Sequence, residues 1–142
     1  MIDSNFIKNS KFSTQNVSRE TLDELNKYSL SIIKKNKEIN LISSSTEKSI
    51  NTRHIADSAQ TIDFIDRNDV KVCTDLGSGA GLPGIVLAIL MKAKKPEFKV
   101  IFYEKSYHKS NFLKEISKKF KLNTEINQKN IFEQKDLRTD II

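Results

Sequence analysis

The chain has 142 residues, 37% of them hydrophobic, and a formal net charge of +6 at pH 7. This length suits about one globular domain with a single core, and no apolar run approaches the roughly 20 residues that span a bilayer. One cysteine and two histidines exclude an internal disulfide and a structural zinc site, so we expect a cytoplasmic, monomeric protein with no membrane segment and no metal.

The N-terminal part of the sequence predicts helices. Residues 1–17 are polar and lack periodicity, which indicates an irregular arm. Apolar residues then recur near the helical period over residues 18–39, with Ser18 as the candidate N-cap. A cluster of serines and a threonine interrupts the pattern, and a second helical stretch is predicted from residue 47 to about residue 65. We therefore expect a helical N-terminal region over residues 18–66.

Strand and helix patterns alternate in the second half of the chain, over residues 67–142. The predicted strands are 70–76, 99–103 and 124–127, and the predicted helices are 83–92 and 107–120. Alternation of this kind favours a parallel sheet whose strands are joined by right-handed helical crossovers. The fold class expected is α/β.

The sequence ends on Thr139-Asp140-Ile141-Ile142, a pattern typical of one more buried strand. A parallel sheet needs helices on both faces, and two crossover helices would leave one face partly bare. We therefore expect a C-terminally truncated chain with about four strands. The alternative is a small domain whose last strand lies at a sheet edge.

Positive charge is concentrated in residues 92–121, which hold ten lysines and three glutamates. A basic zone of this size attracts phosphate groups and permits a nucleic-acid partner. Lysine-rich coding bias and an ordinary solvated helix face explain the same residues. Composition leaves both interpretations open.

All four glycines fall within eight positions, directly after the first predicted strand, at Gly77, Gly79, Gly81 and Gly84. Glycine allows positive φ and close approach of a ligand to the backbone, so the turn predicts a cofactor site. Its letters fit both the dinucleotide pattern G-x-G-x-x-G and the adenosylmethionine pattern D-x-G-x-G-x-G. The carboxylate of Asp75 would repel a pyrophosphate and favour the ammonium and sulfonium charges of S-adenosyl-L-methionine, which we therefore predict as the ligand.

Two later positions are expected to bind the adenosine part of that ligand. Glu104 ends the second strand, where a carboxylate can accept hydrogen bonds from both ribose hydroxyls. The alternative for Glu104 is an exposed acid paired with Lys105 or Lys109. After the third strand, backbone groups at Asn130 and Ile131 are expected to meet the adenine ring, with ordinary core packing as the alternative for Ile131.

Three segments carry a resemblance to a known family: Asn40-Leu41-Ile42, then Arg53-His54-Ile55-Ala56-Asp57-Ser58, then Asp75-Leu76-Gly77-Ser78-Gly79-Ala80-Gly81-Leu82-Pro83-Gly84-Ile85. In this order and spacing they closely resemble the bacterial 16S ribosomal RNA guanine-N7 methyltransferases, also called glucose-inhibited division protein B. The resemblance spans about residues 18–142. It is far more specific than a glycine motif alone.

The resemblance implies a helical region packed on a Rossmann-like class I methyltransferase sheet, with about four of its seven strands present. It also implies S-adenosyl-L-methionine as donor and a guanine of 16S ribosomal RNA in the small ribosomal subunit as acceptor. Motif and resemblance together predict these donor-binding residues: Asp75, Gly77, Ser78, Gly79, Gly81, Leu82, Glu104, Asn130 and Ile131. The chain departs from the family where Asn130-Ile131 replaces an Ala-Glu or similar pair, and it lacks the family's later Ile-Ser-Arg-Ala stretch.

Arg53, His54 and Asp57 are the candidate substrate-binding residues, because their spacing places them on one helix face. We assign Arg53 to RNA phosphate and His54 with Asp57 to ordering the junction between helix and sheet. For His54 the alternative is a structural hydrogen bond from helix to loop. Asn40 is expected to cap the C-terminus of the first helix.

Guanine N7 carries a free lone pair, so methyl transfer to it requires no general base, and we predict no catalytic residue. Rate would come from holding N7 about 3 Å from the methyl carbon, in line with the breaking bond. The competing hypotheses are a methyltransferase for a small molecule or protein, an inactive truncated fragment, and a nicotinamide-dependent oxidoreductase.

Overall fold

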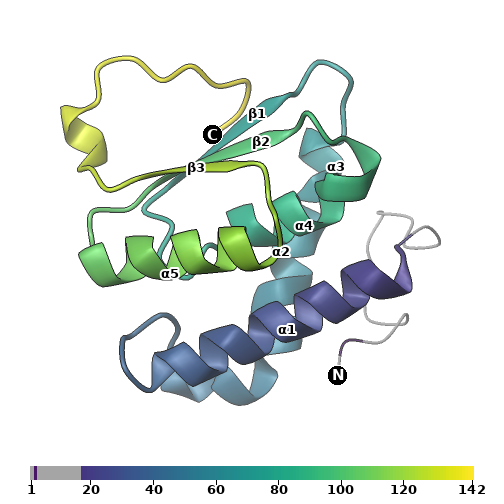
Figure 1. The fold of residues 1–142 in the computed structure, drawn as a ribbon, viewed down its shortest axis with the longest axis vertical. Coiled ribbons are helices and arrows are strands. Elements are labelled where there is room, and N and C mark those ends of the chain that lie inside the picture. The colour runs from purple at the N-terminus through teal and green to yellow at the C-terminus, as the bar shows by residue number, and fades with distance from the viewer. Residues whose placement is uncertain (1, 3–16) are drawn as a thin grey trace.

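A computed structural model describes residue 2 and residues 17–142 of the chain. It shows a parallel sheet, two helices packed on one face of it, and further helices packed below those two (Figure 1). The predicted α/β class is confirmed, with an incomplete Rossmann-like sheet. The predicted irregular arm lies outside the described residues except for residues 2 and 17.

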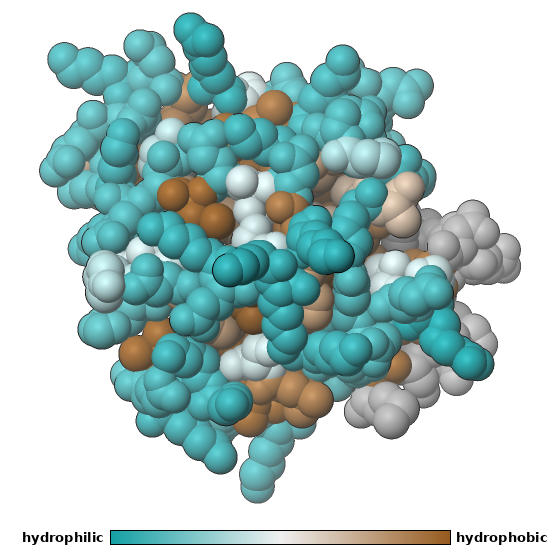
Figure 2. Space-filling view, viewed as in Figure 1, coloured by the Kyte–Doolittle hydropathy of each residue, from teal (hydrophilic) through white to brown (hydrophobic). Residues whose placement is uncertain are grey.

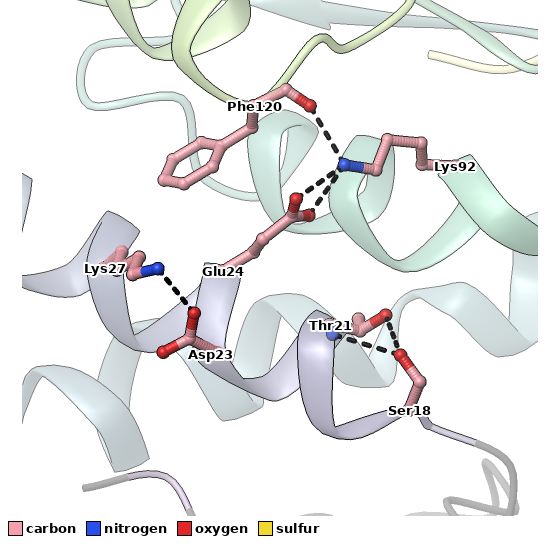
Figure 3. Close-up of polar contacts among 7 residues, drawn as sticks. All are labelled: Ser18, Thr21, Asp23, Glu24, Lys27, Lys92 and Phe120. Atoms are coloured by element: carbon pink, nitrogen blue, oxygen red, sulfur yellow. Dashed lines mark hydrogen bonds and ion pairs between the residues drawn. The ribbon is translucent and has the colours of Figure 1, made fainter.

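Helix α1 spans Arg19–Asn36 and begins where the sequence predicts. The hydroxyl oxygen of Ser18 accepts a hydrogen bond of 3.1 Å from the backbone N–H of Thr21, which satisfies one of the unpaired donors of the first turn (Figure 3). Leu25, Tyr28 and Ile32 lie along the buried face of α1. The periodicity that predicted the helix therefore corresponds to its core-facing side.

The end of α1 differs from the prediction. The helix stops at Asn36, and the side-chain oxygen of Asn36 accepts hydrogen bonds from the backbone N–H groups of Leu41 and Ile42, at 2.9 and 3.0 Å. This side chain stabilises the reversal of the chain, so the helix cannot run on to residue 39. The prediction that Asn40 caps the helix is wrong; Lys37 occupies the C-cap position.

The second predicted helix is broken into four short pieces. They are a 3₁₀ helix η2 (Ser44–Ser49), a π-helix η3 (Asn51–Ala56), and two α-helices α2 (Asp57–Gln60) and α3 (Ile62–Ile65). The hydroxyls of Ser49, Thr52 and Thr61 each donate to the carbonyl oxygen three residues earlier. Such bonds compete with the regular helical pattern, which explains why apolar periodicity alone did not give one continuous helix.

The sheet contains strands β1 (Val72–Leu76), β2 (Lys99–Tyr103) and β3 (Thr124–Asn127), all parallel, in the order β1-β2-β3. β2 and β3 have the predicted bounds, and β1 begins two residues later than predicted. The register aligns Leu76 with Tyr103 and Tyr103 with Asn127. The segments that follow the three strands therefore all start on the same side of the sheet, at the carboxyl ends of the strands.

Helices α4 (Gly84–Lys94) and α5 (Tyr107–Lys119) are the two crossovers, and both lie on the same face of the sheet (Figure 1). Every residue from Gly84 to Met91 is buried, because α4 lies between the sheet on one side and helices α1 and α2 on the other. A helix covered on all sides needs no polar face. This explains why the sequence of α4 is apolar except for Lys92 and Lys94 near its end.

The fourth strand expected at Thr139-Ile142 is present as a single parallel bridge between Cys73 and Ile141. The carbonyl oxygen of Ile141 accepts a hydrogen bond of 2.9 Å from Thr74, and the Asp140 carboxylate accepts from the N–H groups of Lys71 and Val72. The last residues thus pair with β1 on the side away from β2.

One hydrophobic core joins the helical region to the sheet. It includes Leu25 and Ile32 of α1, Ile62 of α3, and Phe102 of β2. The division of the chain at residues 66 and 67 stays a prediction, because both parts contribute to this core.

The ten lysines of residues 92–121 divide into two groups. Lys92, Lys94 and Lys99 form ion pairs with Glu24, Asp66 and Glu125. Most of the others lie on or beside α5, where Lys114 and Lys118 are exposed. The face that includes α5 is largely hydrophilic (Figure 2), which agrees with a solvated helix and equally with a phosphate-binding surface.

No helix within residues 17–142 combines the length and the apolar character needed to cross a membrane. Among the same residues, histidine, cysteine and acidic side chains do not gather in threes at distances that would hold a metal ion.

Candidate functional site

The glycine loop, residues 77–84, connects the end of β1 to the start of α4. Gly77, Gly79 and Gly81 have φ angles of +68°, +54° and +90°, a region that other residues rarely adopt. The N–H of Gly77 donates to the carbonyl oxygen of Tyr103 at 2.8 Å, and the N–H of Gly81 donates to that of Ser78 at 2.7 Å. The clustered glycines thus allow a tight turn next to the end of β2.

The four glycines serve two different purposes. A Cβ atom added at Gly77 or Gly79 would meet no atom within 4 Å, so the absent side chains leave open space in front of the loop. A Cβ added at Gly81 would lie 2.5 Å from Ile85 Cγ1, and one at Gly84 would lie 2.4 Å from Phe102 Cε1. We therefore call Gly77 and Gly79 the glycine cradle, because their backbone borders open space, whereas Gly81 and Gly84 allow close packing.

Ser78 and Leu82 were predicted to contact the donor with the glycines. Ser78 is buried, and its hydroxyl donates to the carbonyl oxygen of Asp75 at 3.0 Å, so the side chain holds the loop together. Leu82 is partly buried against the core. Direct donor contacts by Ser78, Leu82 and the buried Gly81 stay predictions.

Asp75 is turned toward the start of α4. Its Oδ2 accepts a hydrogen bond of 3.0 Å from the backbone N–H of Gly84. Burial raises the pKa of Asp75 from its ordinary value of 3.8 to about 6, and the charge of Glu104 adds to this rise, while the hydrogen bond from Gly84 opposes it. A carboxylate in such a place is stabilised by a neighbouring cation.

The same contact bears on the choice between the two glycine patterns. In dinucleotide sites the pyrophosphate binds the free N–H groups at the helix N-terminus. Here the Asp75 carboxylate already accepts the N–H of the first residue of α4. A second anion at this position would meet repulsion, which favours a cationic ligand.

The raised pKa of Asp75 predicts a pH-dependent stability. Between about pH 4 and pH 6 the folded protein retains a proton on Asp75 that the unfolded chain has lost, so folding stability falls as pH rises through this window. Asp75→Asn keeps an acceptor for Gly84 but does not titrate. We expect urea midpoints of the wild type to fall relative to Asp75→Asn from pH 4 to pH 6.5; a constant difference would contradict the assignment.

Glu104 lies at the end of β2 and is 7% exposed. Its Oε2 accepts from the N–H of Gly79 at 2.8 Å, and its Oε1 accepts from the N–H of Ser106 at 2.8 Å. The alternative of an exposed acid paired with Lys105 or Lys109 is wrong. Each oxygen keeps a further lone pair, so the carboxylate can still accept a hydrogen bond from a ligand hydroxyl.

Asn130 and Ile131 follow β3 at the sheet edge where the glycine loop begins. The Asn130 side-chain oxygen accepts from the N–H of Phe132 at 3.2 Å and caps the short 3₁₀ helix η4 (Ile131–Glu133). Ile131 is partly buried, and Phe132 is 94% exposed. The side chain of Asn130 is thus used in local structure, and a backbone contact with adenine stays a prediction.

The three candidate substrate residues lie in the broken helical stretch. Arg53 and Asp57 are exposed, and His54 Nε2 lies 2.8 Å from the Thr46 hydroxyl. This hydrogen bond joins η3 to η2, two helical segments, whereas the structural alternative for His54 was a bond from helix to loop. Within the described part of the chain, no hydrogen bond joins His54 to Asp57, and none joins the three residues to the glycine loop. Their role toward substrate stays a prediction.

One residue at the site was missed by the sequence analysis. Tyr28 of α1 is fully buried, and its hydroxyl donates to the carbonyl oxygen of Ala80 in the glycine loop at 2.7 Å. A buried tyrosine needs a hydrogen-bond acceptor. The sequence held one signal for this contact: Tyr28 is an aromatic residue with a hydroxyl among the aliphatic residues Leu25 and Ile32 on the buried face of α1.

Comparison with known proteins gives a consistent result. The family model described as GidB, rRNA small subunit methyltransferase G, matches residues 21–142. The chain is 48% identical over 130 residues to the ribosomal RNA small subunit methyltransferase G of Pelagibacter ubique (strain HTCC1062), covering 90% of the chain and 61% of that protein. It is 40% identical over 127 residues to the protein of the same name from Cereibacter sphaeroides (strain ATCC 17025 / ATH 2.4.3), covering 89% and 61%.

A third relative carries the same name. The protein from Jannaschia sp. (strain CCS1) is 37% identical over 126 residues, covering 89% of the chain and 59% of the relative. The chain thus spans about 60% of the length of these relatives.

Proposed function

The chain belongs to the rRNA small subunit methyltransferase G family, and from this membership and the site geometry we propose that it binds S-adenosyl-L-methionine for methyl transfer to N7 of a guanine in 16S ribosomal RNA. The partner proposed is the small ribosomal subunit or its RNA. We further propose that the protein is cytoplasmic and monomeric.

The observation that supports this function best is the arrangement of two carboxylates around the glycine cradle. Glu104 accepts the N–H of Gly79 on the cradle, and Asp75 accepts the N–H of Gly84 at the far end of the glycine loop. Glu104 retains lone pairs for ribose hydroxyls, and Asp75 provides negative charge for a cationic donor. This arrangement suits an adenosine-containing cation better than a pyrophosphate.

A pocket also borders Asp75, but its lining does not include Gly77, Gly79 or Glu104. Its volume is about 420 Å³, and it lies between β1, α3, α4 and the C-terminal segment. Asp75 is the charged residue of a lining that is otherwise uncharged and includes Phe64, Leu87 and Ile141. A carboxylate in apolar surroundings has few competing partners, so it attracts a cation strongly.

The open space next to Gly77 and Gly79 supports the proposal, because a ligand can approach the backbone there. When bound, S-adenosyl-L-methionine supplies an electrophilic methyl group. The proposed tasks of this chain are to hold the ribose at Glu104, to place negative charge at Asp75, and to bind RNA phosphate at Arg53. No residue has to remove a proton, because guanine N7 has a free lone pair.

The proposal is tested first by calorimetry with S-adenosyl-L-methionine and with NAD. We expect heat of binding with the methyl donor and none with NAD; the reverse would indicate a dinucleotide site. Transfer of labelled methyl groups to unmodified 16S ribosomal RNA and small subunits then tests the substrate. Borohydride reduction and aniline cleavage would mark N7-methylguanine, and label in protein or small molecules only would contradict the RNA assignment.

Glu104→Gln is expected to weaken donor binding about tenfold. The amide that replaces one oxygen would face the N–H of Gly79 or of Ser106, and the charge that favours ribose hydroxyls would be lost. Glu125→Gln on β3 is the matched control, because Glu125 is exposed and pairs with Lys99. Calorimetry measures both affinities. Equal donor affinity in the two variants would remove Glu104 from the site.

A further inference from the structure

Helix α1 reaches the glycine loop through Tyr28. This side chain is 0% exposed, and its hydroxyl lies 2.7 Å from the carbonyl oxygen of Ala80, 52 positions later in the chain. Ala80 is itself buried and stands between Gly79 and Gly81. A side chain from the helical region therefore bonds the backbone of the glycine loop directly after the cradle residue Gly79.

Two further contacts of the loop come from the end of β2. Gly77 donates its N–H to the carbonyl oxygen of Tyr103, and Gly79 donates its N–H to Glu104. Both partners lie at the end of β2. The loop is thus held by β2 through its N–H groups and by α1 through a carbonyl group.

The loop depends on such contacts because its own sequence gives little preference for one shape. Gly77, Gly79 and Gly81 each have many accessible backbone conformations, so the unrestrained loop would populate several. The apparent affinity of a ligand that binds only one of these shapes is proportional to the fraction of molecules that have this shape. A fixed hydrogen bond at Ala80 raises the populated fraction.

We propose that Tyr28 is a positioning residue for the methyl donor: its hydroxyl fixes the Ala80 carbonyl and so keeps the glycine loop in the shape that receives S-adenosyl-L-methionine. This inference rests on the proposed function. It makes the N-terminal helix a part of the donor site, although α1 need not touch the donor itself.

The surroundings of Tyr28 keep its hydroxyl in the donating form. Burial raises the pKa of Tyr28 well above its ordinary value, and the nearby charge of Asp75 acts in the same direction. The hydroxyl therefore remains protonated at neutral pH. Phenylalanine would fill the same space and remove only this donor.

Helix α1 has a second attachment that does not involve the loop. Glu24, one turn before Tyr28, accepts two hydrogen bonds from Lys92 Nζ at 2.6 and 2.9 Å, and Lys92 also donates to the carbonyl oxygen of Phe120 (Figure 3). This contact joins α1 to α4 and to the end of α5. Glu24→Gln weakens the docking of α1 without changing any contact of the loop, so it is the matched control for Tyr28→Phe.

The test compares wild type, Tyr28→Phe and Glu24→Gln by calorimetry and by amide hydrogen exchange. For Tyr28→Phe we expect about fivefold weaker binding of S-adenosyl-L-methionine, the factor that one net hydrogen bond of about 1 kcal/mol is worth. We also expect the Gly81 amide, which closes the turn onto Ser78, to exchange about tenfold faster than in the wild type, with β3 amides as the reference. For Glu24→Gln we expect a lower thermal midpoint and donor affinity within twofold of wild type.

Unchanged donor affinity and unchanged Gly81 exchange in Tyr28→Phe would overturn the inference. Equal weakening in both variants would also overturn it, because docking of α1 as a whole would then be the cause. If the wild type does not bind the donor, the proposed function fails, whereas exchange at Gly81 still reports on the hydroxyl.

A measurement on the wild type covers the case in which Tyr28→Phe does not fold. Coupling between two sites is reciprocal, so saturating donor should slow exchange in α1 as well as at Gly81, and more than in β3. Slowing in α1 no greater than in β3 would contradict a link through Tyr28.

Discussion

Gly79→Asn is expected to lower the affinity for S-adenosyl-L-methionine about 100-fold or more while the protein remains folded. The Cβ of a residue at this position meets no protein atom within 4 Å, so the asparagine side chain would project into the space proposed for the donor. Asparagine is also among the few residues that tolerate the φ of +54° found here. A loss of 100-fold corresponds to about 2.7 kcal/mol of binding free energy.

Calorimetry with the donor measures the loss, and urea unfolding shows that the variant is folded. Gly79→Ala gives the graded comparison: its single methyl group should reduce affinity less than asparagine, although alanine is more strained at this φ and should lower stability more. Asparagine should therefore reduce donor affinity more than alanine, whereas alanine should reduce stability more than asparagine. This difference separates intrusion into the site from damage to the fold. Wild-type affinity in Gly79→Asn would mean that the donor lies elsewhere.

The strands were predicted well because their sequence signals are local. Residues 99–103 and 124–127 form β2 and β3 with the predicted bounds, since short apolar runs between polar turns determine where such strands begin and end. The stretch from residue 47 to residue 65 was predicted as one helix and is four pieces. Apolar periodicity predicts the buried face correctly. It carries no information about hydroxyls such as those of Thr52 and Thr61, which donate to nearby carbonyl oxygens and compete with the regular helical hydrogen bonds.

The candidate site was predicted in part for a similar reason. Asp75 is the last residue but one of β1, and the glycines and Glu104 follow β1 and β2 directly, so parallel topology alone brings them to the carboxyl ends of the strands. Their partners could not be predicted: Gly84 for Asp75, Gly79 for Glu104 and the Ala80 carbonyl for Tyr28 depend on distances set by packing. The different purposes of the four glycines also became visible only with the atoms that surround them.

Gly84→Ala is the substitution for which local preference and packing predict opposite results. Gly84 is the first residue of α4, and alanine in place of glycine in a helix ordinarily stabilises by about 1 kcal/mol. Here the added Cβ would lie 2.4 Å from Phe102 Cε1 and 2.6 Å from Asp75 Oδ2. Phe102 is fully buried, and Asp75 is bonded to the N–H of Gly84, so neither neighbour can move freely.

Overpacking of a close-packed core costs about 1–3 kcal/mol and sometimes more, and two simultaneous overlaps below any normal contact distance place this site at the upper end. We therefore expect Gly84→Ala to lower the free energy of unfolding by about 2–3 kcal/mol, measured by urea unfolding. Gly77→Ala, whose Cβ has no neighbour, would lose only what its positive φ costs.

A double-mutant cycle identifies the cause of that loss. Phe102→Leu removes the ring atoms that a Cβ at position 84 would strike, so it should lower stability by itself but lower it less when Gly84 is already alanine. If the two losses of unfolding free energy add, the overlap with Phe102 is not the cause of the loss. The overlap with Asp75 Oδ2 then remains as the cause. In that case Asp75→Ala should partly restore the stability of Gly84→Ala. The carboxylate of Asp75, which accepts the N–H of Gly84, would then be the group that leaves no space for a side chain at position 84.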